Sequence, residues 1–193
     1  MATEIERKFS ASPETLCKIR EKFTGAWQTI PMQTTYFDTP DASLSARKWT
    51  LRLRLENGEK VCTLKTPGKD GARGEWECRE NAIEDAIPVL CKLGCPEELP
   101  QLTANGLVTV CGAKFTRQAL TVEIPGCKAE LALDEGILLG GGKQIPLCEV
   151  EAELKEGSAD ALDAFALALS QEFGLTEEPK SKFRRALELA KGE

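Results

Sequence analysis

Five stretches of the chain alternate charged with apolar residues, and this pattern limits the possible folds more than any other feature of the sequence. The two clearest are Glu149-Val150-Glu151-Ala152-Glu153-Leu154 and Leu51-Arg52-Leu53-Arg54-Leu55. Because residues i, i+2 and i+4 of a β-strand share one face, we predict that each stretch is a strand with one charged face. The other three stretches place together Glu4, Glu6 and Lys8, then Arg73, Glu75 and Glu77, then Glu130 and Asp134.

The signs of these charges allow two interpretations. Any one strand, taken alone, fits the solvated outer face of an ordinary sheet. Charges at i and i+2 are about 7 Å apart, however, so a like pair costs about 2 kcal/mol at an effective dielectric constant of 20. Purely acidic and purely basic faces therefore favour a barrel whose polar side points inward and encloses cations and a polyanion. Its apolar side would then pack under helices.

The remaining patterns predict an α+β domain. Helix caps and apolar stripes predict helices over 12–24, 83–93, 158–173 and 181–191. Turn signals such as Asn57-Gly58 and Gly140-Gly141-Gly142 separate the strands. With seven to nine strands and no linker, we expect residues 1–193 to form a single domain around a large antiparallel sheet or barrel. Strands are predicted over 3–9, 33–37, 49–56, 59–66, 73–80, 107–111, 115–124, 127–134 and 147–155.

The composition excludes several kinds of chemistry and of partner. The sequence contains no histidine, which excludes Ser-His and Cys-His catalysis and histidine-ligated zinc. Lys and Arg number 25 against 31 Asp and Glu, a net charge of −6, so we expect binding neither to nucleic acid nor to a membrane. No apolar run approaches the ~20 residues of a spanning helix, and the N-terminus is too polar for a secretory signal. We therefore expect a cytoplasmic protein.

The charged faces indicate the chemistry that such a lumen could perform. Carboxylates on adjacent strands supply the hard oxygen ligands that Mg²⁺ or Mn²⁺ prefers. Arginine and lysine on the other walls supply hydrogen-bond donors to phosphate. A metal ion, basic walls and the lack of histidine together indicate phosphoryl chemistry, in which catalysis is largely positioning and charge neutralisation.

An ordered series of motifs resembles the CYTH superfamily, also called the triphosphate tunnel metalloenzymes. The first, Glu4-Ile5-Glu6-Arg7-Lys8-Phe9, resembles the family's Glu-x-Glu-x-Lys signature. A lone Glu-x-Glu-x-Lys is a weak signal, but the series spans about residues 3 to 186. The later blocks are Tyr36-Phe37-Asp38-Thr39-Pro40, Leu51-Arg52-Leu53-Arg54, Thr63-Leu64-Lys65, Arg73-Gly74-Glu75, Arg117, Glu130 to Asp134, Glu149-Val150-Glu151 and Ser181-Lys182.

The resemblance implies an eight-stranded antiparallel barrel, a tunnel with flanking helices that binds a triphosphate and a divalent metal ion. Fusion to the helical CHAD domain, known in some members, is not expected here. By position, Glu4, Glu6, Lys8, Arg52 and Arg54 would form the catalytic centre. The metal would be held by Glu4, Glu6, Glu149 and Glu151, with Asp134 and Glu77 as further ligands or charge partners. Phosphates would contact Lys8, Arg52, Arg54, Lys65, Arg117, Lys182 and Arg185, with Arg73 and Glu75 on the same wall.

The shared motifs leave several activities open. The repeated Leu-Arg and Glu-x-Glu blocks look closest to bacterial inorganic triphosphatases, which split tripolyphosphate into pyrophosphate and phosphate. Thiamine triphosphatase and class IV adenylate cyclase are the alternatives. The cyclases usually carry a His-Phe block that this chain lacks. Trp49 lies three residues before Arg52 and should face away from the lumen, so it does not support stacking on the thiazole of thiamine triphosphate. A non-enzymatic polyphosphate-binding module is the remaining alternative. We expect a monomer or a homodimer.

Overall fold

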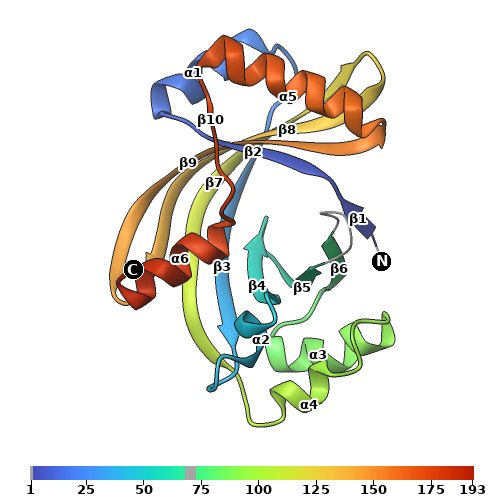
Figure 1. Cartoon of the computed structure of the whole chain (residues 1–193), viewed down its shortest axis with the longest axis vertical. Coiled ribbons are helices and arrows are strands. Elements are labelled where there is room, and N and C mark those ends of the chain that lie inside the picture. Colours follow the sequence, from blue (N-terminus) through green and yellow to red (C-terminus); the bar gives the residue numbers. More distant parts are fainter. Residues whose placement is uncertain (1, 68–72) are drawn as a thin grey trace.

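The computed structural model describes residues 2–67 and 73–193, and for residues 2–4 and 73 it describes the backbone alone. In this described part the chain folds into one curved antiparallel sheet with helices at both ends (Figure 1). The sheet surrounds a central cavity. The strands are β1 (Ala2–Glu4), β2 (Glu6–Ser10), β3 (Gln28–Asp38), β4 (Thr50–Glu56), β5 (Glu59–Pro67), β6 (Arg73–Cys78), β7 (Val108–Ile124), β8 (Cys127–Gly140), β9 (Lys143–Gly157) and β10 (Thr176–Glu177).

The N-terminal segment joins the two ends of this sheet. The strand order is β1-β6-β5-β4-β3-β7-β8-β9-β2-β10. β1 pairs with β6, with Glu4 opposite Arg73, whereas β2 begins two residues later and pairs with β9, with Arg7 opposite Ala152. The sheet therefore does not close as one continuous ladder. If β1 and β2 are taken as one interrupted strand, eight strands surround the cavity, as expected, and β10 is an addition at the edge.

The helices cover the apolar outer faces of the strands. At one end, Leu162 and Leu169 of one helix pack with Val150 and Ala152 of β9. At the other end, Leu64 of β5 packs in a second buried cluster with residues of three further helices. The expected inverted barrel is therefore confirmed, because apolar side chains lie outside the strands. The helices are α1 (Pro13–Lys22), α2 (Ser43–Ala46), α3 (Ile83–Lys92), α4 (Leu99–Thr103), α5 (Ala159–Phe173) and α6 (Lys182–Lys191).

Helix α6 lies away from these two ends, beside the opening of the cavity (Figure 1). Ser181 caps its first turn, because the Ser181 hydroxyl accepts a hydrogen bond from the Arg184 amide at 3.2 Å. Gly140 lets the helix approach β8 closely: a Cβ at this position would lie 2.3 Å from the carbonyl oxygen of Ala186. The tip of the β8–β9 hairpin therefore fixes the position of α6.

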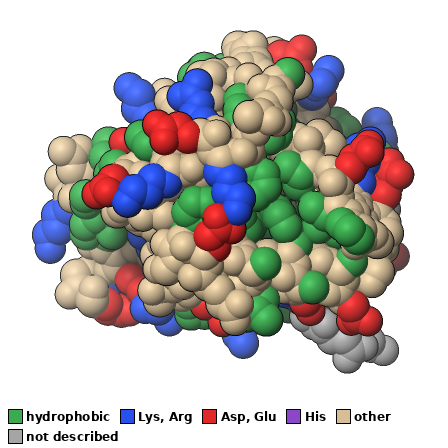
Figure 2. Space-filling view, turned by 90° about the horizontal axis from the view of Figure 1, so that it is seen from above, with side chains coloured by type: hydrophobic (Ala, Val, Ile, Leu, Met, Phe, Trp, Pro, Cys, Tyr) green, Lys and Arg blue, Asp and Glu red, His purple; other side chains and the backbone are tan. Residues whose placement is uncertain are grey.

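One face of the molecule carries a mainly apolar area. Seen from the end that carries α1 and α5, hydrophobic side chains gather between charged ones (Figure 2). Leu167 of α5, at this end, is 57% exposed. Leu93, which follows α3 at the opposite end (Figure 1), is 51% exposed. In the part of the chain that the structure describes, no helix combines the length and the apolar character that crossing a membrane requires.

Candidate functional site

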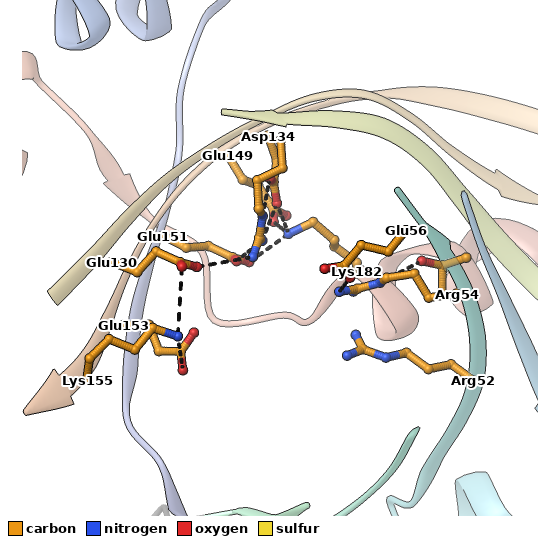
Figure 3. Close-up of polar contacts among 12 residues, drawn as sticks. Arg52, Arg54, Glu56, Glu130, Asp134, Glu149, Glu151, Glu153, Lys155 and Lys182 are labelled. Carbon is orange, nitrogen blue, oxygen red and sulfur yellow. Dashed lines mark hydrogen bonds and ion pairs between the residues drawn. The ribbon is translucent and has the colours of Figure 1, made fainter. Parts of the chain in front are cut away.

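The charged faces of the strands enclose a cavity of about 890 Å³. Acidic side chains of β8 and β9 lie across from Arg52 and Arg54 of β4 (Figure 3). Glu6 of β2 and Lys65 of β5 also line the cavity. The mouth is bordered by α2 and by α6. The period-2 pattern of the strands accounts for this arrangement, because the apolar residues between the charged ones are the ones that pack under the helices.

Three carboxylates come together at the closed side of the cavity. Asp134 of β8 stands opposite Glu149 of β9, and Glu151 follows two residues later on the same face. One oxygen from each of the three lies within 4.8 Å of the others. Asp134 and Glu149 are fully buried. Three buried carboxylates at such distances require compensating cations, because an unpaired buried charge is very costly.

Three cations of the same chain provide that compensation. Lys182, the first residue of α6, places its Nζ 2.9 Å from an oxygen of Asp134 and 2.6 Å from an oxygen of Glu151, and it also contacts Glu149. Arg117 of β7 makes a bidentate contact with Asp134 at 2.7 and 2.8 Å and also contacts Glu151. Arg185 of α6 donates to Glu149. The cluster therefore contains three carboxylates and three cations.

The shifted pKa values of this cluster reflect the pairing. Burial raises the pKa of Glu151, but Lys182 and Arg117 outweigh it and hold that pKa well below its usual range. Burial lowers the pKa of Lys182, but Asp134, Glu151 and Glu149 outweigh it and raise the pKa above its usual value. The same balance, with Glu151 as the largest raising charge, raises the pKa of Arg117. Glu151, Lys182 and Arg117 are therefore ionised at neutral pH.

A second row of carboxylates lies along the same strands. Glu153 of β9 stands opposite Glu6 of β2 on one side and opposite Glu130 of β8 on the other. Lys155 lies 2.9 Å from Glu153 and 4.0 Å from Glu130 (Figure 3). Glu130 and Glu153 were not among the site residues predicted from sequence. The signal was present, since both share the alternating faces of Asp134 and Glu151.

The basic wall lies across the cavity from these acids. Arg52 has its guanidinium 3.9 Å from Glu75, and its Nε is buried without a hydrogen-bond partner in the described part of the chain. Arg54 donates from Nε to the hydroxyl of Thr34 at 3.2 Å. Burial, followed by the charge of Arg52, lowers the pKa of Arg54 to about 10. Two neighbouring buried guanidinium groups, one with an unused donor, form a site that an anion would stabilise.

Lysines extend this wall in both directions. Lys65 of β5 has its Nζ 3.5 Å from Glu75. Lys8 of β2 stands opposite Glu151 in the β2–β9 ladder, and its Nζ donates to the carbonyl oxygen of Lys180 at the mouth. Burial, only partly offset by Glu149, lowers the pKa of Lys8. Lys8 therefore lies beside the acidic strand β9, near the mouth of the cavity.

Most residues predicted from the sequence meet at this cavity. Glu6, Lys8, Arg52, Arg54, Lys65, Arg117, Glu151 and Lys182 line it. Asp134 and Glu149 complete the buried cluster, Arg185 reaches that cluster, and Glu75 lies on the basic wall.

One predicted residue is placed differently, and two others cannot be compared with the prediction. Glu77 is exposed on β6, its carboxylate 3.5 Å from the hydroxyl of Thr63, and it is not one of the three clustered acids. The β6 strand carries it away from β8 and β9. The side chains of Glu4 and Arg73 lie outside the described residues.

The mouth of the cavity contains charged residues that the sequence pattern did not reveal. Lys48, Lys180, Arg184 and Lys191 line it together with Asp41 and Glu188. Glu188 accepts hydrogen bonds from Lys180 and Arg184, both at 2.7 Å. These residues lie in loops and on α6, where no period-2 alternation marks them.

Comparison with known proteins links this site to a family. Residues 2–187 match the CYTH domain family. The inorganic triphosphatase of Haemophilus influenzae is 32% identical over 191 residues, which cover 96% of this chain and 54% of that protein. Human thiamine-triphosphatase is 31% identical over 135 residues, which cover 66% of this chain and 57% of that protein. The chain spans about half the length of the curated relatives it matches.

Solved structures share the fold. A Pyrococcus horikoshii protein superposes with a TM-score of 0.65 at 25% identity, over 96% of this chain and 99% of its own. A Hippeastrum protein described as a putative adenylyl cyclase with a dominant triphosphatase activity gives a TM-score of 0.67 at 19% identity, over 95% and 93% of the two chains. The barrel-like fold is therefore that of the family.

Proposed function

Because the chain belongs to the CYTH domain family, we propose that it binds a triphosphate together with a divalent metal ion in the central cavity and hydrolyses a phosphoanhydride bond. The observation that carries this proposal is the opposition of two walls across one cavity. One wall presents clustered carboxylates, and the other presents Arg52 and Arg54, with a buried Arg52 Nε that has no acceptor in the described residues. An anion on the basic wall would fill that vacant hydrogen-bond position.

The donor set fits a hard metal ion. The clustered ligands are oxygens of Asp134, Glu149 and Glu151, with no nitrogen or sulfur among them, which suits Mg²⁺ or Mn²⁺ better than zinc or copper. We propose that these three hold the ion, with Glu6 and Glu4 from the N-terminal segment as further ligands. When bound, such an ion neutralises charge on phosphate oxygens and polarises the anhydride.

The chain's own residues then bind and orient the anion. Arg52 and Arg54 donate to phosphate oxygens from one wall, while Lys8 and Lys65 contribute charge at its edges. These groups are held before the substrate arrives, so they stabilise developing negative charge without reorganisation. A carboxylate such as Glu153 or Glu6 lies where it can accept a hydrogen bond from a water molecule and orient it.

Inorganic tripolyphosphate is the proposed main substrate. The relative from Haemophilus influenzae is an inorganic triphosphatase, which supports this choice. The cavity also offers no free aromatic surface among the described residues: Tyr36 and Phe183, which line it, pack on each other at 5.1 Å, and Trp49 packs in the buried cluster beneath β4 and β5. An organic base or thiazole ring would therefore gain little by stacking here. A monomer or homodimer in the cytoplasm remains our prediction.

A panel of substrates tests the proposal. Phosphate release is measured from tripolyphosphate, thiamine triphosphate and ATP, each with Mg²⁺ and with Mn²⁺, and cyclic AMP is assayed in the ATP samples. Fastest release from tripolyphosphate is expected. Preference for thiamine triphosphate, or formation of cyclic AMP, would replace the substrate assignment. Tight binding of tripolyphosphate without any release would instead identify a polyphosphate-binding module.

A further inference from the structure

The buried carboxylates of the cavity are already paired. Asp134, Glu149 and Glu151 contact Lys182, and Arg117 and Arg185 form further ion pairs with these carboxylates. Three negative and three positive charges sum to zero, so the cluster as a whole does not attract a further cation. A divalent ion must compete for the same oxygens with an ammonium and two guanidinium groups. The structure thus holds a site whose ligands are occupied by the chain itself.

The position of two of these cations at the start of α6 provides a second observation. The first turn of α6 contains Lys182, Arg184 and Arg185 and no acidic residue. Cations at a helix N-terminus are unfavourable, because the helix dipole and the free amides there favour negative charge. Lys182 and Arg184 of this turn line the cavity, and Arg185 contacts Glu149 of the buried cluster. The arrangement is therefore poorly suited to a helix start by itself but well suited to receiving an anion.

We propose that the metal ion and the triphosphate bind by exchanging ion-pair partners. The metal takes the carboxylates, and the phosphate oxygens take Lys182, Arg185 and Arg117, which the carboxylates release. Either ligand alone leaves charges of one sign without partners, so each ligand promotes the binding of the other. This inference rests on the proposed function and specifies how the cavity recognises its two ligands. Lys182 stays paired with the carboxylates until a phosphate oxygen of the anion binds it.

The exchange predicts an unusual effect of replacing Lys182. Lys182 contacts all three carboxylates and is only 8% exposed. If it only supports the fold, its removal weakens everything that binds nearby. If it competes with the metal, its removal must tighten the binding of metal alone, because the carboxylates lose a competitor a few ångströms away.

The test is Mn²⁺ binding to the full chain without phosphate, measured from the electron paramagnetic resonance signal of free Mn²⁺. We expect Lys182→Met to bind Mn²⁺ at least about tenfold more tightly than the wild type. Arg185→Met, whose guanidinium contacts Glu149 and lies 3.7 Å from Glu178, should shift the affinity in the same direction. Lys22→Met is the matched control, since Lys22 pairs with Glu172 outside the cavity, and it should change the affinity less than about twofold.

The outcomes separate this inference from the proposed function. Unchanged or weaker Mn²⁺ binding in the folded variants would overturn the exchange, and Arg185→Met alone decides the matter if Lys182→Met does not fold. A parallel measurement follows the melting midpoint of the wild type with Mn²⁺ and tripolyphosphate. A raised wild-type midpoint without tighter Mn²⁺ binding in the variants would contradict the exchange only. An unchanged midpoint would contradict the proposed function itself.

Discussion

Asp38 shows how one buried carboxylate shapes the mouth of the cavity. One of its oxygens accepts hydrogen bonds from the amides of Thr39 at 2.8 Å and Leu44 at 2.9 Å, and the other accepts from the amide of Ser45 at 3.1 Å. The side chain therefore fixes the turn into α2, although Ala42 before that helix has a positive φ of 58°. Residues of α2 border the cavity.

Replacing Asp38 with asparagine should destabilise this corner. The amide group offers one oxygen instead of two and places its NH₂ against a backbone donor, which leaves a buried N–H without a partner. We expect Asp38→Asn to lower the free energy of unfolding by about 2 kcal/mol, measured by urea denaturation. Asp160→Asn, an exposed carboxylate in the first turn of α5, should cost less than about 1 kcal/mol. Equal effects of the two substitutions would contradict the role given to Asp38.

The basic wall makes a second prediction about single residues. A lysine keeps the charge of an arginine but loses its planar fork of donors. The Arg52→Lys, Arg54→Lys double variant should therefore lower kcat/KM for tripolyphosphate by at least about 100-fold. The control is Arg79→Lys, an exposed arginine that pairs with Glu59 at 3.1 Å. Wild-type kinetics in the double variant would show that these guanidinium groups do not contact the substrate.

Among the secondary structure elements, α6 depends most on close backbone contact. A Cβ on Gly140 would lie 2.3 Å from the Ala186 carbonyl oxygen and 2.7 Å from the Ala190 amide nitrogen. Gly140→Ala should therefore displace α6 and cost about 1–3 kcal/mol. Hydrogen exchange measured by mass spectrometry should show faster exchange in α6, with α5 unchanged as the internal reference. Unaltered protection of α6 would mean that the helix and hairpin adjust without cost.

The same elements show what a sequence pattern can and cannot reveal. For α5, Ser158 as cap, an apolar stripe and Gly174 in the left-handed conformation are local signals, and the predicted helix over 158–173 agrees with Ala159–Phe173. The short α2 and α4 were missed. Asp38, which holds α2, is the last residue of β3 and precedes that helix by several residues, so no periodic pattern marks its role. β7 runs unbroken through 112–114, where alternation fails, because β3 and β8 pair with it on both sides.

The strand face on which a side chain lies is easier to predict from sequence than the group with which it pairs. The family resemblance implies that Arg117, Lys182 and Arg185 contact phosphates, and that stays a prediction. The structure pairs these cations with carboxylates. A sequence indicates the side of a strand on which a charge lies. Which groups pair across a cavity depends on distances that exist only in the folded barrel. Lys114 lies three residues before Arg117, which puts it on the other face of a regular strand, and it is exposed.

For the whole molecule, binding at the cavity should stabilise the fold. A ligand at 100 times its dissociation constant contributes about 2.7 kcal/mol, which in a domain of this size raises the melting midpoint by several degrees. Tripolyphosphate with Mg²⁺ should raise the midpoint more than Mg²⁺ alone, and EDTA should abolish both the extra shift and turnover. Sulfate at matched ionic strength controls for screening and solute exclusion. Equal shifts with sulfate and tripolyphosphate would contradict a specific anion site.

The N-terminal segment also determines the order in which the molecule can assemble. β2 pairs with β9, with Lys8 opposite Glu151, so this contact closes a loop of most of the chain, and long loops are slow to close. The β7–β8 and β8–β9 hairpins are local and can form first. In refolding followed by pulse-labelled hydrogen exchange, amides of β8 should therefore be protected before those of β2. The cavity, whose acidic wall needs both β2 and β9, becomes complete only in the final step.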